Sequence, residues 1–244
     1  MKKLMGIFLG VCLTLACADV VAAQDSKGGP PKVLTIAREF VKPGKTGATH
    51  EKSESLFIQA YAKAKWPTHY LGMESLSGRS RALFFTGYAS FEAWEKDAMA
   101  QQKNEAFSAG FAHASLVDGE LLEGFDQSVW TYSEEGSNAG GIEISHMRYF
   151  EIERFQIRAG REKEWNDIVK LVKPALIKAN PDTHWAMYYG VYGVPALTAI
   201  VITPLRSATE IDHAMAQEPK FGAALGDDGM KKLSELSAIA IESS

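Results

Sequence analysis

Apolar and polar positions along the chain predict the same order of elements twice: strand, helix, hairpin, helix, strand. The segments 33–42 and 147–158 are rich in β-branched and apolar residues, and each ends at a turn that contains glycine. A helical pattern follows each of these strands, and next comes a hairpin that turns at Gly78 or Gly193. This repetition predicts two domains of the same fold.

The clearest helical pattern lies in the second half. Pro174 falls inside it and is expected to kink the helix or to move its boundary. The second helix of each half is expected to begin at a serine, Ser90 or Ser207, and Glu210 would complete a capping box with Ser207. The apolar residues of the first pattern share one helical face: Trp165, Ile168, Val169, Val172 and Leu176.

The closing strands differ between the halves. Residues 125–132 predict a full strand at the end of the first half, whereas residues 238–244 leave room only for a stub in the second. We therefore expect an uncovered sheet edge in the second half, at which the chain could pair with another chain.

The repeat can be aligned by residue number. An offset of 116 places Arg38 on Arg154, and an offset of 115 places His69 on His184. The predicted organisation is a signal peptide at 1–23, a flexible arm at 24–32, a first repeat at 33–133, a linker at 134–144 and a second repeat at 145–244.

The first 23 residues have the pattern of an export signal. Lys2 and Lys3 precede an apolar stretch at 4–16, and small residues precede a cleavage site before Gln24. We expect a periplasmic or extracellular protein, with a lipoprotein acylated at Cys17 as the alternative. Cleavage would also remove Cys12 and Cys17, the only cysteines, and with them any disulfide or thiolate metal site.

Composition narrows the class of partner. The chain of 244 residues is 46% hydrophobic and has a formal net charge of −4, with no basic cluster. The chain therefore offers no cluster of positive charge to which a nucleic acid could bind. No apolar stretch after the first 23 residues is long enough to span a membrane.

Two short segments resemble a known superfamily. Residues 37–45 resemble the first strand and Pro-Gly turn of NIPSNAP-like and antibiotic-biosynthesis-monooxygenase-like domains, and residues 90–94 resemble the start of their second helix. The resemblance implies an α+β fold of the dimeric α/β-barrel superfamily, in which two tandem ferredoxin-like βαββαβ repeats form one barrel from antiparallel sheets. That superfamily includes cofactor-independent monooxygenases and haem-dependent enzymes, so we expect no cofactor, with haem as the alternative.

The candidate catalytic residues are His69, His184 and Tyr189. The two histidines hold the same repeat position and could act as general base or axial ligand, with Tyr189 as an orienting donor. The alternative is a strand-entry histidine whose ring bonds to backbone.

The candidate ligand-binding residues are aromatic, sulfur-containing or charged. On the strand after His184, side chains alternate between two faces, and either face would present aromatic groups to a cavity in the barrel. The arginines could bind an anion or form structural ion pairs, and the aromatic groups could equally be a filled core. The residues are Arg38, Glu74, Arg154, Trp185, Met187 and Tyr188.

No metal site is predicted. His50 and Glu54 lie four residues apart on a predicted helix and could share an ion, but a pair of this kind is more typical of a solvated face.

Three functions remain compatible with these patterns. The leading hypothesis is an exported protein that binds a small hydrophobic or aromatic ligand in the barrel. The alternatives are a monooxygenase-like or haem-binding enzyme, and a structural barrel without ligand that pairs through its open edge. The sequence leaves open whether the protein is an enzyme.

Overall fold

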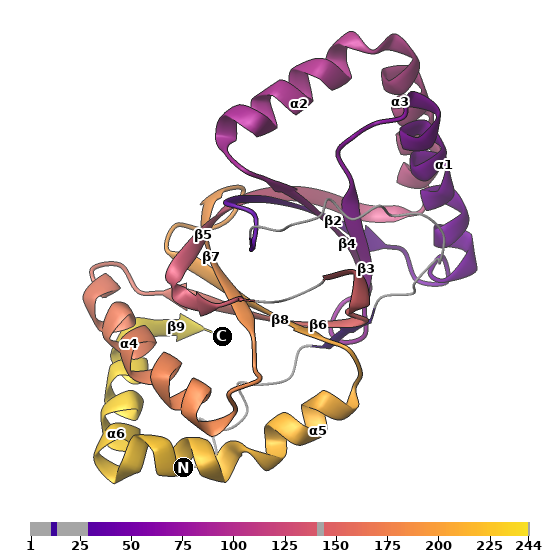
Figure 1. Cartoon of the computed structure of the whole chain (residues 1–244). Coiled ribbons are helices and arrows are strands. Elements are labelled where there is room, and N and C mark those ends of the chain that lie inside the picture. Colours follow the sequence, from indigo (N-terminus) through magenta and orange to yellow (C-terminus); the bar gives the residue numbers. More distant parts are fainter. Residues whose placement is uncertain (1–10, 14–28, 141–143, 244) are drawn as a thin grey trace.

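The computed structural model describes residues 11–13, 29–140 and 144–243 (Figure 1). Most of the predicted signal peptide and of the flexible arm lies outside the described residues, as does part of the predicted linker. No described helix combines the length and the apolar character that crossing a membrane requires.

The described elements repeat the predicted order. The strands are β1 (Val11–Leu13), β2 (Val33–Val41), β3 (Tyr70–Ser75), β4 (Arg81–Tyr88), β5 (Leu122–Asn138), β6 (Tyr149–Ile157), β7 (Trp185–Tyr192), β8 (Thr198–Leu205) and β9 (Ile241–Ser243). The helices are α1 (Ala48–Ala64), α2 (Phe91–Lys103), α3 (Glu105–Gly119), α4 (Glu162–Ala179), α5 (Thr209–Ala216) and α6 (Glu218–Ala240), with one 3₁₀ turn at Ile144–His146.

The strands form one antiparallel sheet in the order β1-β3-β4-β2-β5-β7-β8-β6-β9. The first repeat supplies β3-β4-β2-β5 and the second supplies β7-β8-β6-β9, so each repeat has the strand order of a ferredoxin-like βαββαβ unit. The long strand β5 joins the two units by pairing with both β2 and β7. The α+β class and the tandem repeat are therefore confirmed.

The prediction that the two repeats form one barrel is wrong, because the strands of the repeats do not close the sheet by themselves. Among the described strands, β3 and β6 are not paired with each other, and the short β1 pairs antiparallel with both. The backbone of Cys12 lies opposite Ser75 on one side and Phe150 on the other. At the far end of β6, the expected C-terminal stub is β9, where Ile241 pairs with Ile157.

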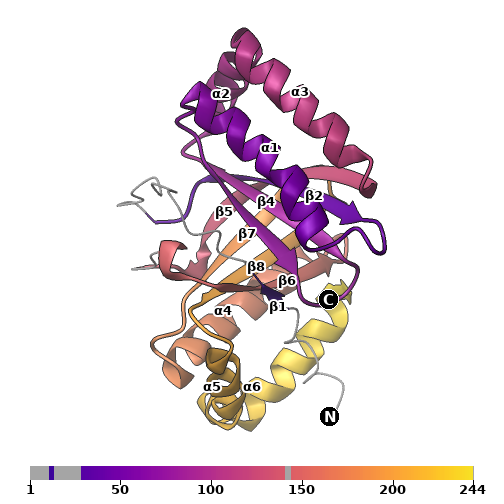
Figure 2. The ribbon, with the colours of Figure 1, turned by 90° about the vertical axis from the view of Figure 1, so that its right-hand side faces the viewer.

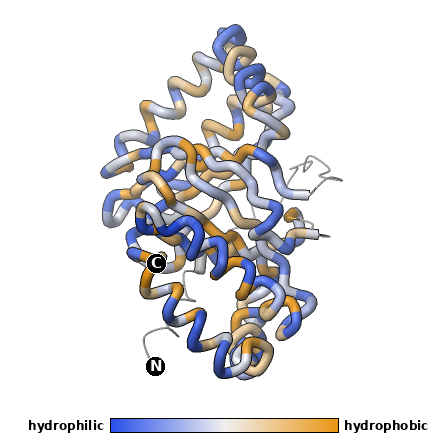
Figure 3. Tube along the Cα trace, turned by 90° about the vertical axis from the view of Figure 1, so that its left-hand side faces the viewer, coloured by the Kyte–Doolittle hydropathy of each residue, from blue (hydrophilic) through white to orange (hydrophobic). Residues whose placement is uncertain are grey.

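Helices cover the outer face of the curved sheet, in one group for each repeat (Figure 1). Figure 2 shows α1, α2 and α3 on one side and α4, α5 and α6 on the other. Figure 3 shows apolar positions concentrated along the strands, while the helices mix apolar and hydrophilic positions. One buried cluster joins the inward faces of both repeats and includes Leu34, Ile36, Met73, Leu83, Phe85, Trp130, Phe150, Tyr188, Ile200 and Ile202. This cluster fills the space that the sheet encloses.

Local signals at the helices are confirmed in part. The Ser90 side chain accepts a hydrogen bond of 3.1 Å from the backbone N–H of Ala93, as the expected N-cap requires. The prediction for Ser207 is wrong, since α5 begins two residues later and its N-cap is Ala208. Pro174 lies inside α4 without ending it. The helix continues because its apolar face is held by packing that outweighs one lost hydrogen bond.

Candidate functional site

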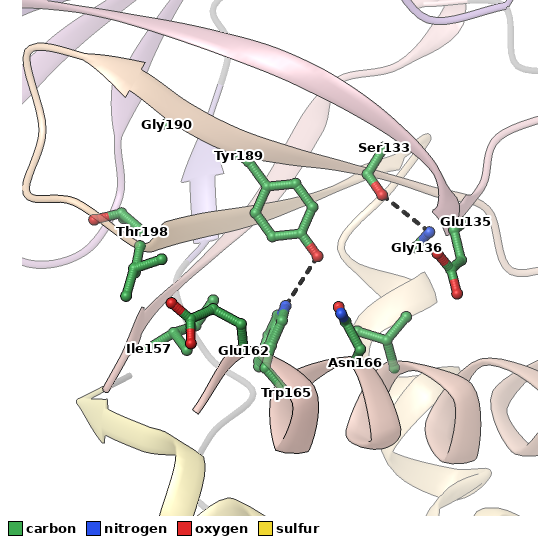
Figure 4. A pocket seen from close by; sticks show the side chains of 12 residues that line it. Ser133, Glu135, Gly136, Ile157, Glu162, Trp165, Asn166, Tyr189, Gly190 and Thr198 are labelled. Carbon is green, nitrogen blue, oxygen red and sulfur yellow. Dashed lines mark hydrogen bonds between the residues drawn. The ribbon is translucent and has the colours of Figure 1, made fainter. Parts of the chain in front are cut away.

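A pocket of about 340 Å³ lies in the second repeat, between the outer face of the sheet and α4 (Figure 4). Its lining residues come from β5, from β6 and α4, and from the β7–β8 hairpin. Most of the lining surface is apolar, and the polar groups come from serine, asparagine, tyrosine and two glutamates. The full set is Ser133, Glu135, Gly136, Ile157, Glu162, Trp165, Asn166, Val169, Tyr189, Gly190, Leu197 and Thr198.

An irregularity in β5 shapes one wall of this pocket. The register between β5 and β7 shifts between Ser133 and Asn138, so the intervening backbone leaves the regular ladder. The backbone N–H of Gly136 donates to Ser133 Oγ at 3.2 Å, and the Gly136 carbonyl accepts a bond of 2.7 Å from Trp185 Nε1. Because the N–H and the carbonyl of Gly136 are both hydrogen-bonded, this wall of the pocket is held in place without the regular strand pairing between β5 and β7.

A hydrogen-bonded aromatic pair carries the polar chemistry of the pocket. Trp165 Nε1–H donates to the Tyr189 hydroxyl at 2.9 Å (Figure 4). Burial raises the pKa of Tyr189, while hydrogen bonds with Trp165 and Ser133 act in the opposite direction and the charge of Glu135 adds to the rise. The phenol is therefore neutral at pH 7, and because it accepts from Trp165, its own proton can be donated to Ser133 or to a molecule in the pocket.

Successive side chains of β7 point to opposite faces of the sheet. Tyr188 faces the space enclosed by the sheet, where it packs edge-on against Tyr132 with ring centroids 5.6 Å apart. Met187 and Tyr189 face α4 instead. Trp185 and Met187 are buried, and neither is among the residues that line the pocket. Of the ligand-binding and catalytic residues predicted on this strand, only Tyr189 reaches the pocket.

The two predicted histidines lie just outside the strands that follow them. His69 is exposed in the connection before β3. His184 is half-buried before β7, and its Nδ1 lies 3.3 Å from the carbonyl oxygen of Asn138. That contact matches the alternative of a strand-entry histidine bonded to backbone. Neither histidine lines the pocket.

The predicted charged residues have three different surroundings. Arg38 forms a two-pronged ion pair with Asp126, the residue opposite it on the neighbouring strand β5. Arg38 Nε lies 2.6 Å from Asp126 Oδ1, and one terminal guanidinium nitrogen lies 2.9 Å from Oδ2. Its guanidinium is thus already engaged by a carboxylate, as the ion-pair alternative expected. Arg154 is exposed. Glu74 lies near a buried group of side chains in the first repeat, where its Oε1 is 3.9 Å from His50 Nδ1.

The expected location of the cavity was the interior of the barrel, and the pocket lies elsewhere. Side chains of the central cluster fill the interior, which is the filled-core alternative. The pocket instead forms on the helix-covered face, where Trp165 meets Tyr189. The sequence did place Trp165 on the buried stripe of α4 and Tyr189 on the same face as Met187, but it gave no sign of the irregular β5 wall.

The pocket does not suit haem. Haem iron takes histidine, cysteine, methionine or tyrosinate as protein ligand. None of the first three lines the pocket among the described residues, and the raised pKa of Tyr189 disfavours the phenolate.

No protein-family model and no curated protein matches the chain. Solved structures match most of its length. A "putative monooxygenase" from Fusobacterium nucleatum subsp. nucleatum aligns with a TM-score of 0.55 and 11% identity, covering 87% of this chain and 88% of that one. The protein has the fold of the dimeric α/β-barrel, ferredoxin-like superfamily.

Two further structures extend the comparison. A protein of the same description from Lactobacillus acidophilus aligns with a TM-score of 0.50 and 7% identity, over 88% of this chain and 90% of that one. A NIPSNAP family protein from Agrobacterium tumefaciens aligns over 42% of this chain and 93% of its own, with 14% identity and a TM-score of 0.32. The fold that the resemblance of residues 37–45 and 90–94 implied is confirmed by the two structures described as putative monooxygenases.

Proposed function

We propose that the protein binds a small, neutral aromatic molecule in the pocket between α4 and the sheet. The observation that carries this proposal is the Tyr189 hydroxyl, which is held by Trp165 at 2.9 Å beside an apolar wall and keeps a proton to donate. An apolar pocket with a few fixed polar groups is typical of small-molecule sites, and its volume is at the lower end of their range.

The charges at the pocket restrict the class of ligand. Glu135 and Glu162 both belong to the lining, and Figure 4 shows the Glu162 carboxylate directed toward the pocket from the start of α4. Glu135 is paired with Lys170 at 3.7 Å, so the Glu162 carboxylate is the charge that repels anions here. The proposal is therefore a phenol or another neutral aromatic alcohol rather than an aromatic acid.

A titration with 2-naphthol tests this proposal, with 2-naphthoate as the anionic comparison. We expect saturable binding of 2-naphthol, several-fold weaker binding of 2-naphthoate, and about fivefold weaker 2-naphthol binding in Tyr189→Phe, because one hydrogen bond of about 1 kcal/mol is lost. Tyr192→Phe is the matched control, since Tyr192 ends the same strand, is exposed and lies outside the pocket lining. Absence of saturable 2-naphthol binding, or an equal loss in both variants, overturns the proposal.

Oxidation of the bound molecule in a monooxygenase-like reaction is the second candidate function. It is supported by the names of the two fold neighbours and by a phenol donor in the pocket. The role of His69 or His184 as base is less well supported, since neither lines the pocket. Oxygen consumption that depends on an added phenol and on Tyr189 is the result this candidate requires.

Export remains part of the proposal. It rests on the basic, apolar and small-residue pattern of residues 1–23. Cell fractionation with N-terminal sequencing tests it: we expect mature protein that begins at Gln24, and full-length protein in the cytoplasm would refute it.

Self-association through the sheet edge of the second repeat also remains a prediction, which light scattering of the purified protein checks.

A further inference from the structure

A histidine and three carboxylates meet in the first repeat, between the sheet and its helices. His50 Nε2 lies 3.3 Å from Glu39 Oε2, 3.4 Å from Asp118 Oδ1 and 3.7 Å from Glu54 Oε1. One ligand atom from each of the four residues lies within 4.8 Å of the ligand atoms of the others. His50 and Asp118 are 1% exposed and Glu39 is 6% exposed. The expectation that His50 and Glu54 belong to a solvated face is therefore wrong for His50.

Three elements bring these side chains together. Successive side chains of a strand point to opposite faces of the sheet. Leu34 and Ile36 of β2 face the central cluster, so Glu39, three residues after Ile36, faces the helices. His50 and Glu54 lie one turn apart on α1 and project from one face of that helix. Asp118 comes from the last turn of α3. The group is thus fixed by long-range packing of α1 and α3 on β2, which local sequence patterns do not reveal.

The group has more hydrogen-bond acceptors than donors. One imidazole N–H at Nε2 can serve only one of the three neighbouring carboxylates. Ser53 Oγ lies 2.6 Å from Asp118 Oδ1 and can donate there. Glu54 Oε1 is buried and has no hydrogen-bond partner among the described residues. Buried carboxylates are costly unless donors or cations compensate them, and a shared proton or a bound cation would supply what this group lacks.

The second repeat shows that the fold does not require these charges. The buried positions of α1 and α4 match at an offset of 115, which places His50 on Trp165, Ser53 on Ile168 and Ala60 on Ala175. The same offset places Glu54 on Val169.

The strand residue changes in the same way. At the 116 offset of the first strands, Glu39 corresponds to Phe155, and the Phe155 and Trp165 rings pack with centroids 5.2 Å apart. Where one repeat has an ordinary apolar contact, the other has a histidine and carboxylates. This difference indicates a role other than folding.

We propose that Glu39, His50, Glu54 and Asp118 bind one divalent first-row metal ion, such as Mn²⁺, Fe²⁺ or Zn²⁺. Ligand atoms held at about 2.0–2.2 Å from a small ion lie roughly 3–3.5 Å apart, which is close to the separations around His50 Nε2. Imidazole suits Zn²⁺ and Fe²⁺, and carboxylates suit Mn²⁺, so the mixed set fits these ions rather than a thiophilic ion.

Glu74 has a supporting position in this site. Its Oε1 faces Nδ1 of His50, the ring nitrogen opposite the carboxylate group, at 3.9 Å. A carboxylate that faces the free ring nitrogen of a metal-bound histidine orients the ring and raises its basicity. Glu74 and Glu54 are also the partly exposed members of the group, at 37% and 16%. The exposed side of the site therefore lies between them.

Metal content and affinity of the full chain test this proposal. The protein is stripped with a chelator and titrated with Mn²⁺ and with Zn²⁺ by calorimetry, and pulsed electron paramagnetic resonance of the Mn²⁺ form detects directly bound nitrogen. We expect one ion per chain and a nitrogen coupling that His50→Gln abolishes. Glu74 supports a ligand without binding the ion, so we expect Glu74→Gln to weaken metal binding by roughly 10- to 100-fold. We expect Glu39→Gln and Glu54→Gln, which remove proposed ligands, to weaken it by more than that.

Glu153→Gln is the matched control, because Glu153 lies on the corresponding first strand of the second repeat, and we expect it to leave affinity unchanged. Circular dichroism establishes that each variant is folded before its affinity is compared. Absence of a stoichiometric ion in the wild-type protein overturns the proposal. So does a site whose affinity is the same in Glu39→Gln, Glu54→Gln and Glu153→Gln.

Discussion

His50 on α1 and Trp165 on α4 hold equivalent buried positions in the two repeats, at 1% and 4% exposure. The same position therefore carries a titratable group in one repeat and an aromatic group in the other. The first repeat surrounds its histidine with carboxylates, while the second uses its tryptophan to hold Tyr189 at the edge of a pocket. Duplication has given two copies of one scaffold with different chemistry between helices and sheet.

Replacement of Glu54 by leucine should stabilise the metal-free protein. Burial and the charges of Glu39 and Asp118 raise the pKa of Glu54 to about 9, and its Oε1 lacks a hydrogen-bond partner among the described residues. Val169 shows that the fold accepts an apolar residue at this position. We expect Glu54→Leu to raise the free energy of unfolding by about 1–2 kcal/mol in urea with chelator present.

The control for this experiment is Glu51→Leu, which changes an exposed glutamate of the same helix and should stay within about 0.5 kcal/mol of wild type. If Glu54→Leu destabilises the metal-free protein by more than the control does, the carboxylate is part of a satisfied structural network instead.

Asp97 holds together the end of the first hairpin and the second helix. Its Oδ1 accepts from Trp66 Nε1 and Thr68 Oγ1, and its Oδ2 accepts from Tyr88 and Gln101. An asparagine cannot accept at both positions, so Asp97→Asn should lower the free energy of unfolding by about 2–3 kcal/mol. Chemical denaturation measures this loss. The exposed Asp182→Asn should change little, and equal effects of the two substitutions would contradict the role given to Asp97.

The two hairpin glycines should respond differently to alanine. Gly78 and Gly193 both have positive φ, at 75° and 73°. A Cβ at Gly78 meets only Arg81 at 3.8 Å, whereas one at Gly193 would lie 2.0 Å from the backbone oxygen of Gln127. Gly78→Ala should therefore cost about 1–2 kcal/mol from backbone strain alone.

Gly193→Ala adds a backbone clash to that strain and should lower the melting temperature much further. Thermal melts of the two variants side by side measure the difference. Similar melting temperatures would show that β5 does not approach the second hairpin this closely.

Glu153 should make stability depend on pH. Burial and, to a smaller extent, the charge of Glu151 raise the pKa of Glu153 to about 8. The folded state then binds a proton that the unfolded state releases from about pH 4.5 upward, so this contribution to stability falls as pH rises to about 8 and is constant above that. The difference between wild type and Glu153→Gln in urea unfolding, measured from pH 5 to 9, should show this fall. A constant difference across that range would show that Glu153 keeps an ordinary pKa.

Much of the fold could be predicted because strand alternation and helical periodicity depend on residues that are close together in the chain. The alternation in β7 and the stripe that includes Trp165 both describe faces that the structure buries. The two sites could not be predicted in the same way. The pocket depends on the irregular stretch of β5 after Ser133, and the charged group joins Glu39 to Asp118, which are far apart in the chain. In the sequence, His50 and Glu54 alone look like residues of a solvated helix face.

The repeat itself held the signal that could have revealed the charged group. Alignment of the halves sets Glu39 against Phe155 and His50 against Trp165, which exchanges two polar residues for two aromatic ones. Glu39, His50 and Trp165 are buried, and Phe155 is partly buried. A comparison of the halves for differences, in addition to identities, would have pointed to this position.

Anomalous X-ray scattering from crystals grown with Mn²⁺ tests the central claim most directly. The account predicts one strong peak per chain, within bonding distance of His50 Nε2 and of oxygens from Glu39, Glu54 and Asp118. Crystals of Glu54→Gln should show a weaker peak or none. A map without a peak among these four side chains, at a Mn²⁺ concentration well above the measured Kd, would contradict the account.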